Sequence, residues 1–143
     1  LYRVLRCDKV TIGLLEETLR SYRSQSFSKN NLSLTMLTTS RKVLKTRGQK
    51  ILDSLQKKTI KDLGILLVDS EVEAGSGSLP DDKIESASLS FSPKNGKVKD
   101  LAKAFRCGSI PVVGYIQKNT FYIDLKAVLP NQIKRLSTSI QEI

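Results

Sequence analysis

The spacing of apolar residues changes along this 143-residue chain, and the change limits the folds that the chain can adopt. Apolar residues near the start recur at helical spacing, as Val10, Leu14, Leu15, Leu19 and Tyr22. Further along, apolar residues alternate with serines over positions 87–92, and this period of two is typical of a strand with one buried face. A chain with both periods predicts an α+β fold, in which a small, mostly antiparallel sheet packs on helices.

The first part of the chain, residues 1–62, is predicted to be a basic helical segment. A first helix covers the apolar stripe described above, and a polar loop is expected at 24–33. A second helix is expected to start at Thr38 or Thr39, where a side-chain oxygen can accept a hydrogen bond from a free backbone N–H. Its apolar positions continue to Leu55, with lysine and arginine on much of its remaining surface.

Residues 63–143 are predicted to form the α+β sheet portion of the same domain. Apolar, β-rich runs predict strands at 65–68, 87–91, 110–116 and 120–125. Helical stripes predict a short helix at 98–105 and a last helix with Pro130 in its first turn. The polar segment 71–82 is predicted to be a loop, and 117–119 a tight hairpin connection.

The composition excludes several kinds of active site. The chain has no histidine, which rules out a Ser-His or Cys-His nucleophile pair within it. Two cysteines, Cys7 and Cys107, cannot fill the four positions of a zinc site, so no metal is expected. They are also too few for a disulfide framework, and we expect reduced, semi-buried thiols in a cytoplasmic protein. No apolar run approaches a membrane span, so no membrane partner is expected either.

The net charge of +10 is concentrated in the first part of the chain. Residues 1–62 contain 14 Lys and Arg against 5 Asp and Glu, whereas residues 63–143 contain 10 against 9. A surplus of +9 in the first part favours a polyanionic partner such as RNA. A solvated helix surface rich in lysine explains the same surplus, and charge alone leaves both interpretations open.

Several segments carry a recognisable pattern in a fixed order from Arg3 to Pro130. They are Arg3-Val4-Leu5-Arg6-Cys7-Asp8-Lys9-Val10-Thr11 with Leu14-Leu15-Glu16-Glu17-Thr18-Leu19, Met36-Leu37-Thr38, Ser70-Glu71-Val72 with Gly75-Ser76-Gly77-Ser78-Leu79-Pro80, Arg106-Cys107-Gly108-Ser109-Ile110-Pro111-Val112-Val113-Gly114, and Phe121-Tyr122-Ile123-Asp124-Leu125 with Val128-Leu129-Pro130. In order and spacing, the chain resembles the bacterial selenocysteine synthases over nearly its whole length. It departs from their pattern at Ile110, where proline is usual, and at Tyr115, where arginine is usual.

The resemblance implies the fold of type I pyridoxal-phosphate enzymes, with this chain as the small C-terminal domain. The large domain, with the lysine that carries pyridoxal phosphate, is then expected upstream, and a start at Leu1 without Met fits such a fragment. The family converts seryl-tRNA(Sec) to selenocysteyl-tRNA(Sec) with selenophosphate, and its members are homo-oligomers. We therefore expect this fragment to be inactive alone and active as part of the longer protein.

The resemblance also assigns a catalytic role to Arg3 and Arg6. Both lie where the family places active-site arginines, and they would clamp the anionic selenium donor beside the cofactor. Arginine suits this role because its planar guanidinium can pair with two oxygens at once. The alternative is a pair of solvated arginines near a chain end.

Substrate-binding roles are predicted for Arg106 and for the loop residues Ser76, Gly77 and Ser78. Small domains of type I pyridoxal-phosphate enzymes often bind substrate through an arginine in such an R-x-G turn. The alternative for Arg106 is a cation favoured by the carbonyl end of a helix. The Gly-Ser loop can present backbone N–H groups to an anion, or it can simply connect two strands.

None of the lysines Lys9, Lys83 and Lys126 is expected to carry the cofactor, and each is predicted to be a surface lysine. Two other functions stay open at the level of sequence. One is a related pyridoxal-phosphate enzyme that acts on a small amino acid, and the other is a non-catalytic, basic RNA-binding domain.

Overall fold

The first helix, α1 (Lys9–Arg23), begins where the sequence places a carboxylate. The side chain of Asp8 accepts hydrogen bonds from the backbone N–H groups of Val10 and Thr11, at 2.8 and 2.9 Å, which satisfies donors that have no partner inside the helix. The helix confirms the predicted apolar stripe. No residue of α1 is buried, however, so its apolar side chains remain exposed.

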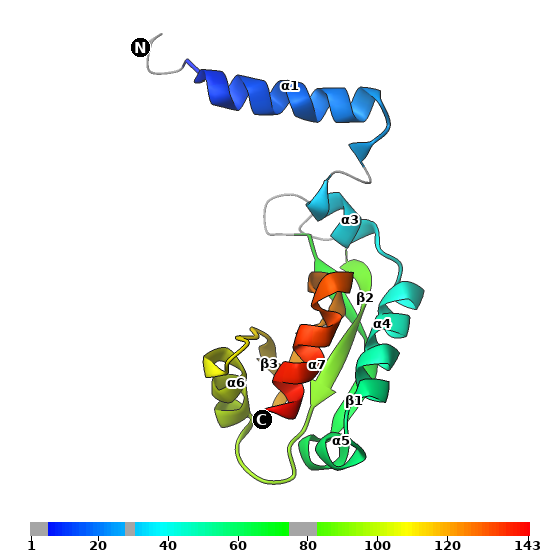
Figure 1. Cartoon of the computed structure of the whole chain (residues 1–143), viewed down its shortest axis with the longest axis vertical. Helices are drawn as coiled ribbons and strands as arrows, with labels where there is room; N and C mark the ends of the chain where they lie inside the picture. Colours follow the sequence, from blue (N-terminus) through cyan, green and yellow to red (C-terminus); the bar gives the residue numbers. More distant parts are fainter. Residues whose placement is uncertain (1–5, 28–30, 75–82) are drawn as a thin grey trace. The chain divides into compact units, whose positions relative to one another are not determined.

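The structure, a computed structural model, describes residues 6–27, 31–74 and 83–143. The chain divides into two compact units, Leu1–Thr38 and Thr39–Ile143, and each is described by itself (Figure 1). No helix in the described ranges is both long enough and apolar enough to cross a bilayer.

A short helix, α3 (Leu32–Thr38), starts inside the segment that was predicted to be a loop. The side-chain oxygen of Asn31 accepts a hydrogen bond from the backbone N–H of Leu34 at 3.0 Å, which stabilises the first turn. The loop prediction for the last residues of 24–33 was therefore wrong, because an asparagine cap and the apolar residues after it favour a helix.

The predicted second helix is two helices in the structure, α4 (Arg41–Ser54) and α5 (Lys57–Leu63). The helix α4 begins after Ser40, one or two residues later than expected. It ends at Leu55, whose extended backbone interrupts the helix while its side chain stays buried. Gly64 ends α5 in the left-handed region at a φ of 57°, and a Cβ there would collide with the carbonyl oxygen of Ser92.

Four strands form one antiparallel sheet in the order β1-β2-β4-β3. They are β1 (Ile65–Glu73), β2 (Lys83–Phe91), β3 (Tyr115–Gln117) and β4 (Thr120–Asp124). The α+β class and the antiparallel sheet are confirmed. The predicted strands 65–68 and 87–91 were too short, because β1 and β2 pair from Ile65–Phe91 out to Glu73–Lys83. Residues 75–82 lie outside the described part.

The strand predicted at 110–116 is largely irregular chain, and β3 begins only at Tyr115. The backbone N–H of Val112 donates to the carbonyl oxygen of Phe105 at 2.9 Å, so it does not join the sheet. The predicted hairpin after β3 is confirmed. Lys118 and Asn119 both have positive φ, 46° and 60°, as the tight turn between antiparallel strands requires.

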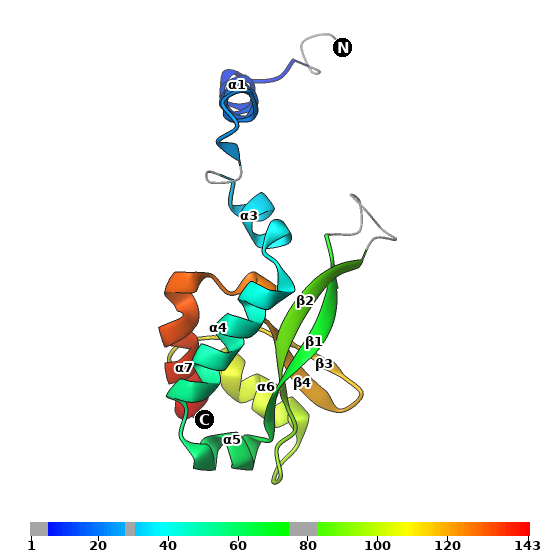
Figure 2. The same ribbon diagram turned by 90° about the vertical axis from the view of Figure 1, so that its right-hand side faces the viewer.

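The helices of the unit Thr39–Ile143 pack on one face of the sheet, as Figures 1 and 2 show for α4, α6 (Val98–Cys107) and α7 (Ile133–Gln141). The rings of Phe91, Phe105 and Phe121 meet with centroids 5.2 to 5.8 Å apart at the centre of this layer. The short turn η2 (Pro130–Gln132) precedes α7, as the proline predicted. These rings come from β2, α6 and β4, so the hydrophobic core lies between the two strands and the helices.

Candidate functional site: a polar cluster at the start of α4

Arg6, one of the two predicted catalytic arginines, is exposed and lies two residues before the cap of α1. Asp8, two residues further on, caps the N-terminus of α1. The hydrogen bonds that its carboxyl accepts lower its pKa, and the one from the backbone of Thr11 has the largest effect. Asp8 is thus engaged with the helix rather than with a ligand. Arg3 lies outside the described residues, as do Ser76, Gly77 and Ser78.

Arg106 is exposed in the last turn of α6, followed by Cys107 and Gly108. This position is open to a ligand, and it also lies at the carbonyl end of the helix, where a cation is favoured. Both interpretations therefore stay open. Arg6 and Arg106 belong to different units, and each unit is described by itself.

Cys7 and Cys107 are both exposed. The expectation of semi-buried thiols was wrong. Cys107 lies two residues beyond Phe105, the last buried position of α6, so the turn of the helix points the Cys107 side chain away from the core.

The end of β4 contains a carboxylate that sequence reasoning did not single out. Asp124 accepts hydrogen bonds from the hydroxyls of Ser70, Ser86 and Ser88, at 2.8, 2.6 and 2.9 Å. It also accepts one from the backbone N–H of Lys126 at 2.9 Å. Donors from β1, β2 and the turn after β4 thus converge on one side chain, and hydrogen bonds to an ionised acceptor are the stronger kind. This network ties the end of β4 to both long strands.

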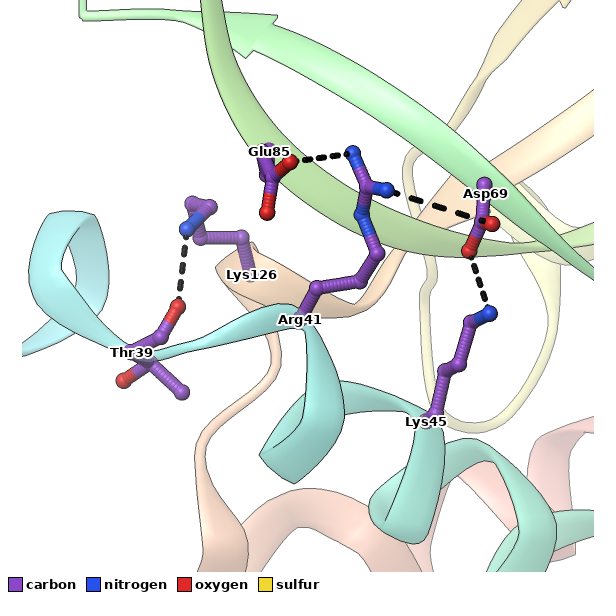
Figure 3. Close-up of polar contacts among 6 residues, drawn as sticks. All are labelled: Thr39, Arg41, Lys45, Asp69, Glu85 and Lys126. Atoms are coloured by element: carbon purple, nitrogen blue, oxygen red, sulfur yellow. Dashed lines mark hydrogen bonds and ion pairs between the residues drawn. The ribbon is translucent and has the colours of Figure 1, made fainter.

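Lys126 lies in the short turn η1 (Leu125–Ala127) and is only 5% exposed, so the prediction of a surface lysine was wrong. Its ammonium group donates to the carbonyl oxygen of Thr39 at 3.0 Å (Figure 3). Burial lowers the pKa of Lys126, and the charges of Asp124 and Glu85 oppose that shift. A sequence signal was available, because Lys126 is a charged residue inside the apolar run 121–129.

The first turns of α4 are attached to the sheet by ion pairs (Figure 3). Arg41 lies 3.3 Å from Glu85 and 4.0 Å from Asp69, and Lys45 lies 2.7 Å from Asp69. The hydrogen bond from Lys45 lowers the pKa of Asp69, and the charges of Lys45 and Arg41 lower it further against desolvation. The Nε of Arg41 is buried and has no hydrogen-bond partner among the described residues.

Two of the hollows beside Asp124 and the first turns of α4 contain carboxylates. One, of about 260 Å³, is lined by apolar residues together with Asp124, Gln132 and one cation, Arg135. The other, of about 770 Å³, lies beside Arg41 on the sheet, and there Arg41 and Lys83 are outnumbered by carboxylates: Asp69, Glu71 and Glu73. Neither of these two hollows concentrates positive charge, so the residues that line them do not form an anion clamp. A third hollow, of about 550 Å³, is lined by Arg41, Lys42 and Lys45.

Comparison with known proteins decides the family. Residues 1–129 match the family model described as L-seryl-tRNA selenium transferase. The chain belongs to this family. It is similar to the L-seryl-tRNA(Sec) selenium transferases of Escherichia fergusonii, at 33% identity over 132 residues, and of Escherichia coli O45:K1, at 33% over 136 residues. These matches cover 90% and 92% of this chain, but only 28% and 29% of the relatives. The chain thus spans less than a third of the length of its selenium transferase relatives.

The family resemblance implies pyridoxal phosphate, and neither Lys126 nor Lys83 fits the role of its carrier. Lys126 is buried, but its ammonium is committed to the carbonyl oxygen of Thr39 and it lines none of the three hollows. Lys83 is exposed and paired with Glu71 at 3.5 Å. Among the residues that the structure describes, no group of acidic or cysteine side chains could hold a metal ion.

Proposed function

We propose that the longer protein containing this chain is a pyridoxal-phosphate-dependent selenium transferase, which converts seryl-tRNA(Sec) to selenocysteyl-tRNA(Sec) with selenophosphate. The observation that carries the proposal is the family match over residues 1–129, supported by relatives that bear this name. The cofactor is then held by a lysine outside this chain. The chain itself is the small C-terminal domain of a type I pyridoxal-phosphate enzyme and is inactive alone.

In this proposal Arg3 and Arg6 hold the anionic selenium donor. Arg6 is exposed, and the next carboxylate along the chain, Asp8, is occupied by the N-terminus of α1. The guanidinium of Arg6 is therefore available to an anion. A fork of N–H donors binds two oxygens of a selenophosphate group at once, which fixes the orientation of the donor as well as its position.

Arg106 and the loop residues Ser76, Gly77 and Ser78 are proposed to contact the substrate. Arg106 is exposed at the end of α6, so it can reach a ligand without rearrangement of the core. The serine of seryl-tRNA is esterified and has no free carboxylate. We therefore expect Arg106 to contact a phosphate or ester oxygen of the tRNA end rather than a carboxylate.

The +9 surplus of residues 1–62 supports a tRNA partner. It supports a non-catalytic RNA-binding domain equally, and an enzyme for a small amino acid would not need it. A homo-oligomeric, cytoplasmic enzyme is part of the proposal, by analogy with the family.

The test is single-turnover conversion of seryl-tRNA(Sec) by the full-length protein, followed with and without selenophosphate. Selenocysteyl-tRNA should form only with both substrates and with pyridoxal phosphate bound, as its visible absorbance reports. Conversion of free serine or cysteine without tRNA would favour the amino-acid enzyme. Tight tRNA binding with no cofactor and no turnover would favour the RNA-binding domain.

A further inference from the structure

A hydrogen bond from the buried Lys126 holds the backbone where the chain enters the unit Thr39–Ile143. Thr39 is the first residue of that unit, and its carbonyl oxygen accepts the hydrogen bond from Lys126 at 3.0 Å. The two residues are 87 positions apart in the sequence. A single side chain from the turn after β4 therefore holds the backbone just before α4 (Figure 3).

The backbone of Lys126 is held in place by Asp124 and its hydrogen-bond partners. Its backbone N–H donates to Asp124, whose carboxylate also accepts the hydroxyls of Ser70, Ser86 and Ser88. Ser86 and Ser88 are fully buried. The position of the ammonium group is thus set by β1, β2 and β4 together, and not by a mobile surface side chain.

The ion pairs of α4 are weaker attachments of the same segment. The side chains of Lys45, Asp69 and Glu85 are 47%, 51% and 71% exposed, so water screens their interactions with one another and with Arg41. Lys126, at 5% exposure, is not screened in this way. The hydrogen bond from Lys126 is therefore expected to determine the position of the start of α4 on the sheet.

We propose that Lys126 is a positioning residue, which holds the backbone at Thr39 and so fixes the start of α4 on the sheet. This inference rests on the proposed function in one respect. Arg106, a proposed substrate contact, lies in the same unit as Thr39 and Lys126. A loose start of α4 would leave Arg106 intact but would disturb the unit that carries it.

The first measurement needs no activity. In the full-length protein, hydrogen–deuterium exchange is followed by mass spectrometry in peptides spanning 39–47, whose amides include that of Leu44, bonded to the carbonyl of Ser40 at 3.1 Å. Lys126→Met should raise exchange there about tenfold or more, because the variant cannot form the hydrogen bond from a charged donor. Peptides from β2 and β4 should be unchanged. Lys134→Met removes an exposed lysine from α7 and should change neither region.

Lys126→Arg and Lys126→Gln extend the test, because both keep an N–H donor, and Arg also keeps the charge. Arg should restore most of the protection, and Gln only part of it. If Lys126→Met does not fold, the exchange of peptides 39–47 in the Arg and Gln variants still tests whether Lys126 holds the backbone at Thr39. Wild-type exchange at 39–47 in both the Met and Gln variants would overturn the anchor, as would an equal rise in β2 and β4.

The second measurement connects the anchor with selenium transfer. Lys126→Met should lower kcat about tenfold, while tRNA affinity and the cofactor absorbance stay at the wild-type level. Increased exchange with an unchanged kcat would overturn the positioning role. If the wild-type protein transfers no selenium, the proposed function fails, and the exchange comparison still decides whether Lys126 holds the entry of the chain.

Discussion

Lys126 differs from the exposed charged residues of the chain because the protein, and not water, balances its charge. The carbonyl of Thr39 binds its ammonium, and Asp124 and Glu85 supply opposite charge. Burial nevertheless lowers its pKa from the ordinary value of 10.5. The charged form is therefore less favourable in the folded chain than in the unfolded chain, which links folding to pH.

The sign of this linkage gives a prediction for the chain at alkaline pH. Between the lowered pKa and 10.5, the folded state binds fewer protons at Lys126 than the unfolded state does. The contribution of Lys126 to the free energy of unfolding should therefore rise with pH across that window and fall again as the pH drops through the lowered pKa. Urea denaturation from about pH 7.5 to about pH 10.5 measures the effect as the difference between wild type and Lys126→Met. Parallel curves for the two proteins would contradict it.

Arg6 offers a prediction for the reaction step. In the full-length enzyme, Arg6→Ala should leave the cofactor absorbance and tRNA affinity nearly intact and slow selenium transfer. Removal of a charge-assisted hydrogen bond costs about 1.5 to 3 kcal/mol, or roughly ten- to a hundredfold in rate if the bond acts in the transition state. Arg6→Lys should recover only part of the rate, because an ammonium keeps the charge but lacks the fork.

The measurement is single-turnover conversion of seryl-tRNA at several selenophosphate concentrations, with Arg3→Ala and Arg20→Ala alongside. Arg20 is exposed in α1 and paired with Glu16 at 2.7 Å, so its variant serves as the matched control. Wild-type transfer rates in the Arg3 and Arg6 variants would exclude the clamp. Loss of the cofactor in either variant would point to a structural role.

Among the helices, α1 and α4 both have an apolar stripe, but only α4 buries side chains in the structure. Leu44 and Ile51 of α4 are fully buried, whereas Leu15 of α1 is 58% exposed. An amphipathic helix draws most of its stability from tertiary packing. The two helices should therefore respond differently to the replacement of a leucine.

Leu15→Ser should change the free energy of unfolding of the chain by no more than about 0.5 kcal/mol, since Leu15 is not part of the buried core. Leu44→Ala should lower it by about 2 to 5 kcal/mol, because it leaves a cavity between α4 and the sheet. Urea denaturation followed by circular dichroism compares the two variants. A large decrease in stability in Leu15→Ser would mean that α1 packs on a surface within this chain.

The same distinction explains how far the sequence predicts the fold. Apolar stripes located α1, α4, α6 and α7, and the period of two located the buried end of β2. The outer halves of β1 and β2 were missed because polar and charged residues predominate there and Val72 with Ile84 is the one apolar pair among them. The interruption at Leu55 was missed because both α4 and α5 continue to supply apolar residues at helical spacing.

The candidate site was predictable only in part. The positions of Arg6 and Arg106 came from the family resemblance, and the structure adds their exposure. Lys126 was missed because its partners, Thr39 and the Asp124 network, come from distant segments that only the folded sheet brings together. A charge inside an apolar run can indicate such a site, but local spacing does not identify the partner.

For the whole molecule, the basic first part should determine tRNA affinity. Lys42 and Lys50 are exposed on α4, whereas Lys45 already pairs with Asp69. Lys42→Glu combined with Lys50→Glu in the full-length protein should weaken tRNA binding. It should also flatten the salt dependence, by about 0.7 to 0.9 in logarithmic slope for each phosphate that the protein no longer neutralises.

Filter binding from about 50 to about 300 mM salt measures both quantities. Lys134→Glu combined with Arg135→Glu makes the same change in net charge within the less basic part and should have a smaller effect. Equal effects of the two double variants would mean that overall charge, and not the α4 surface, controls affinity.

The order of the sheet has a consequence for the behaviour of the protein in concentrated solution. Among the described strands, β1 is the first in the order β1-β2-β4-β3, so it pairs with a strand on one side and forms an edge of the sheet on the other. Alternate residues Asp69, Glu71 and Glu73 are exposed carboxylates. Two copies that joined their sheets along this edge would have to bring together these carboxylates and the lysines paired with Asp69 and Glu71, and charged side chains on an edge strand oppose fibril-like self-association at neutral pH. Acidification removes that protection, and edge-to-edge aggregation should then become easier.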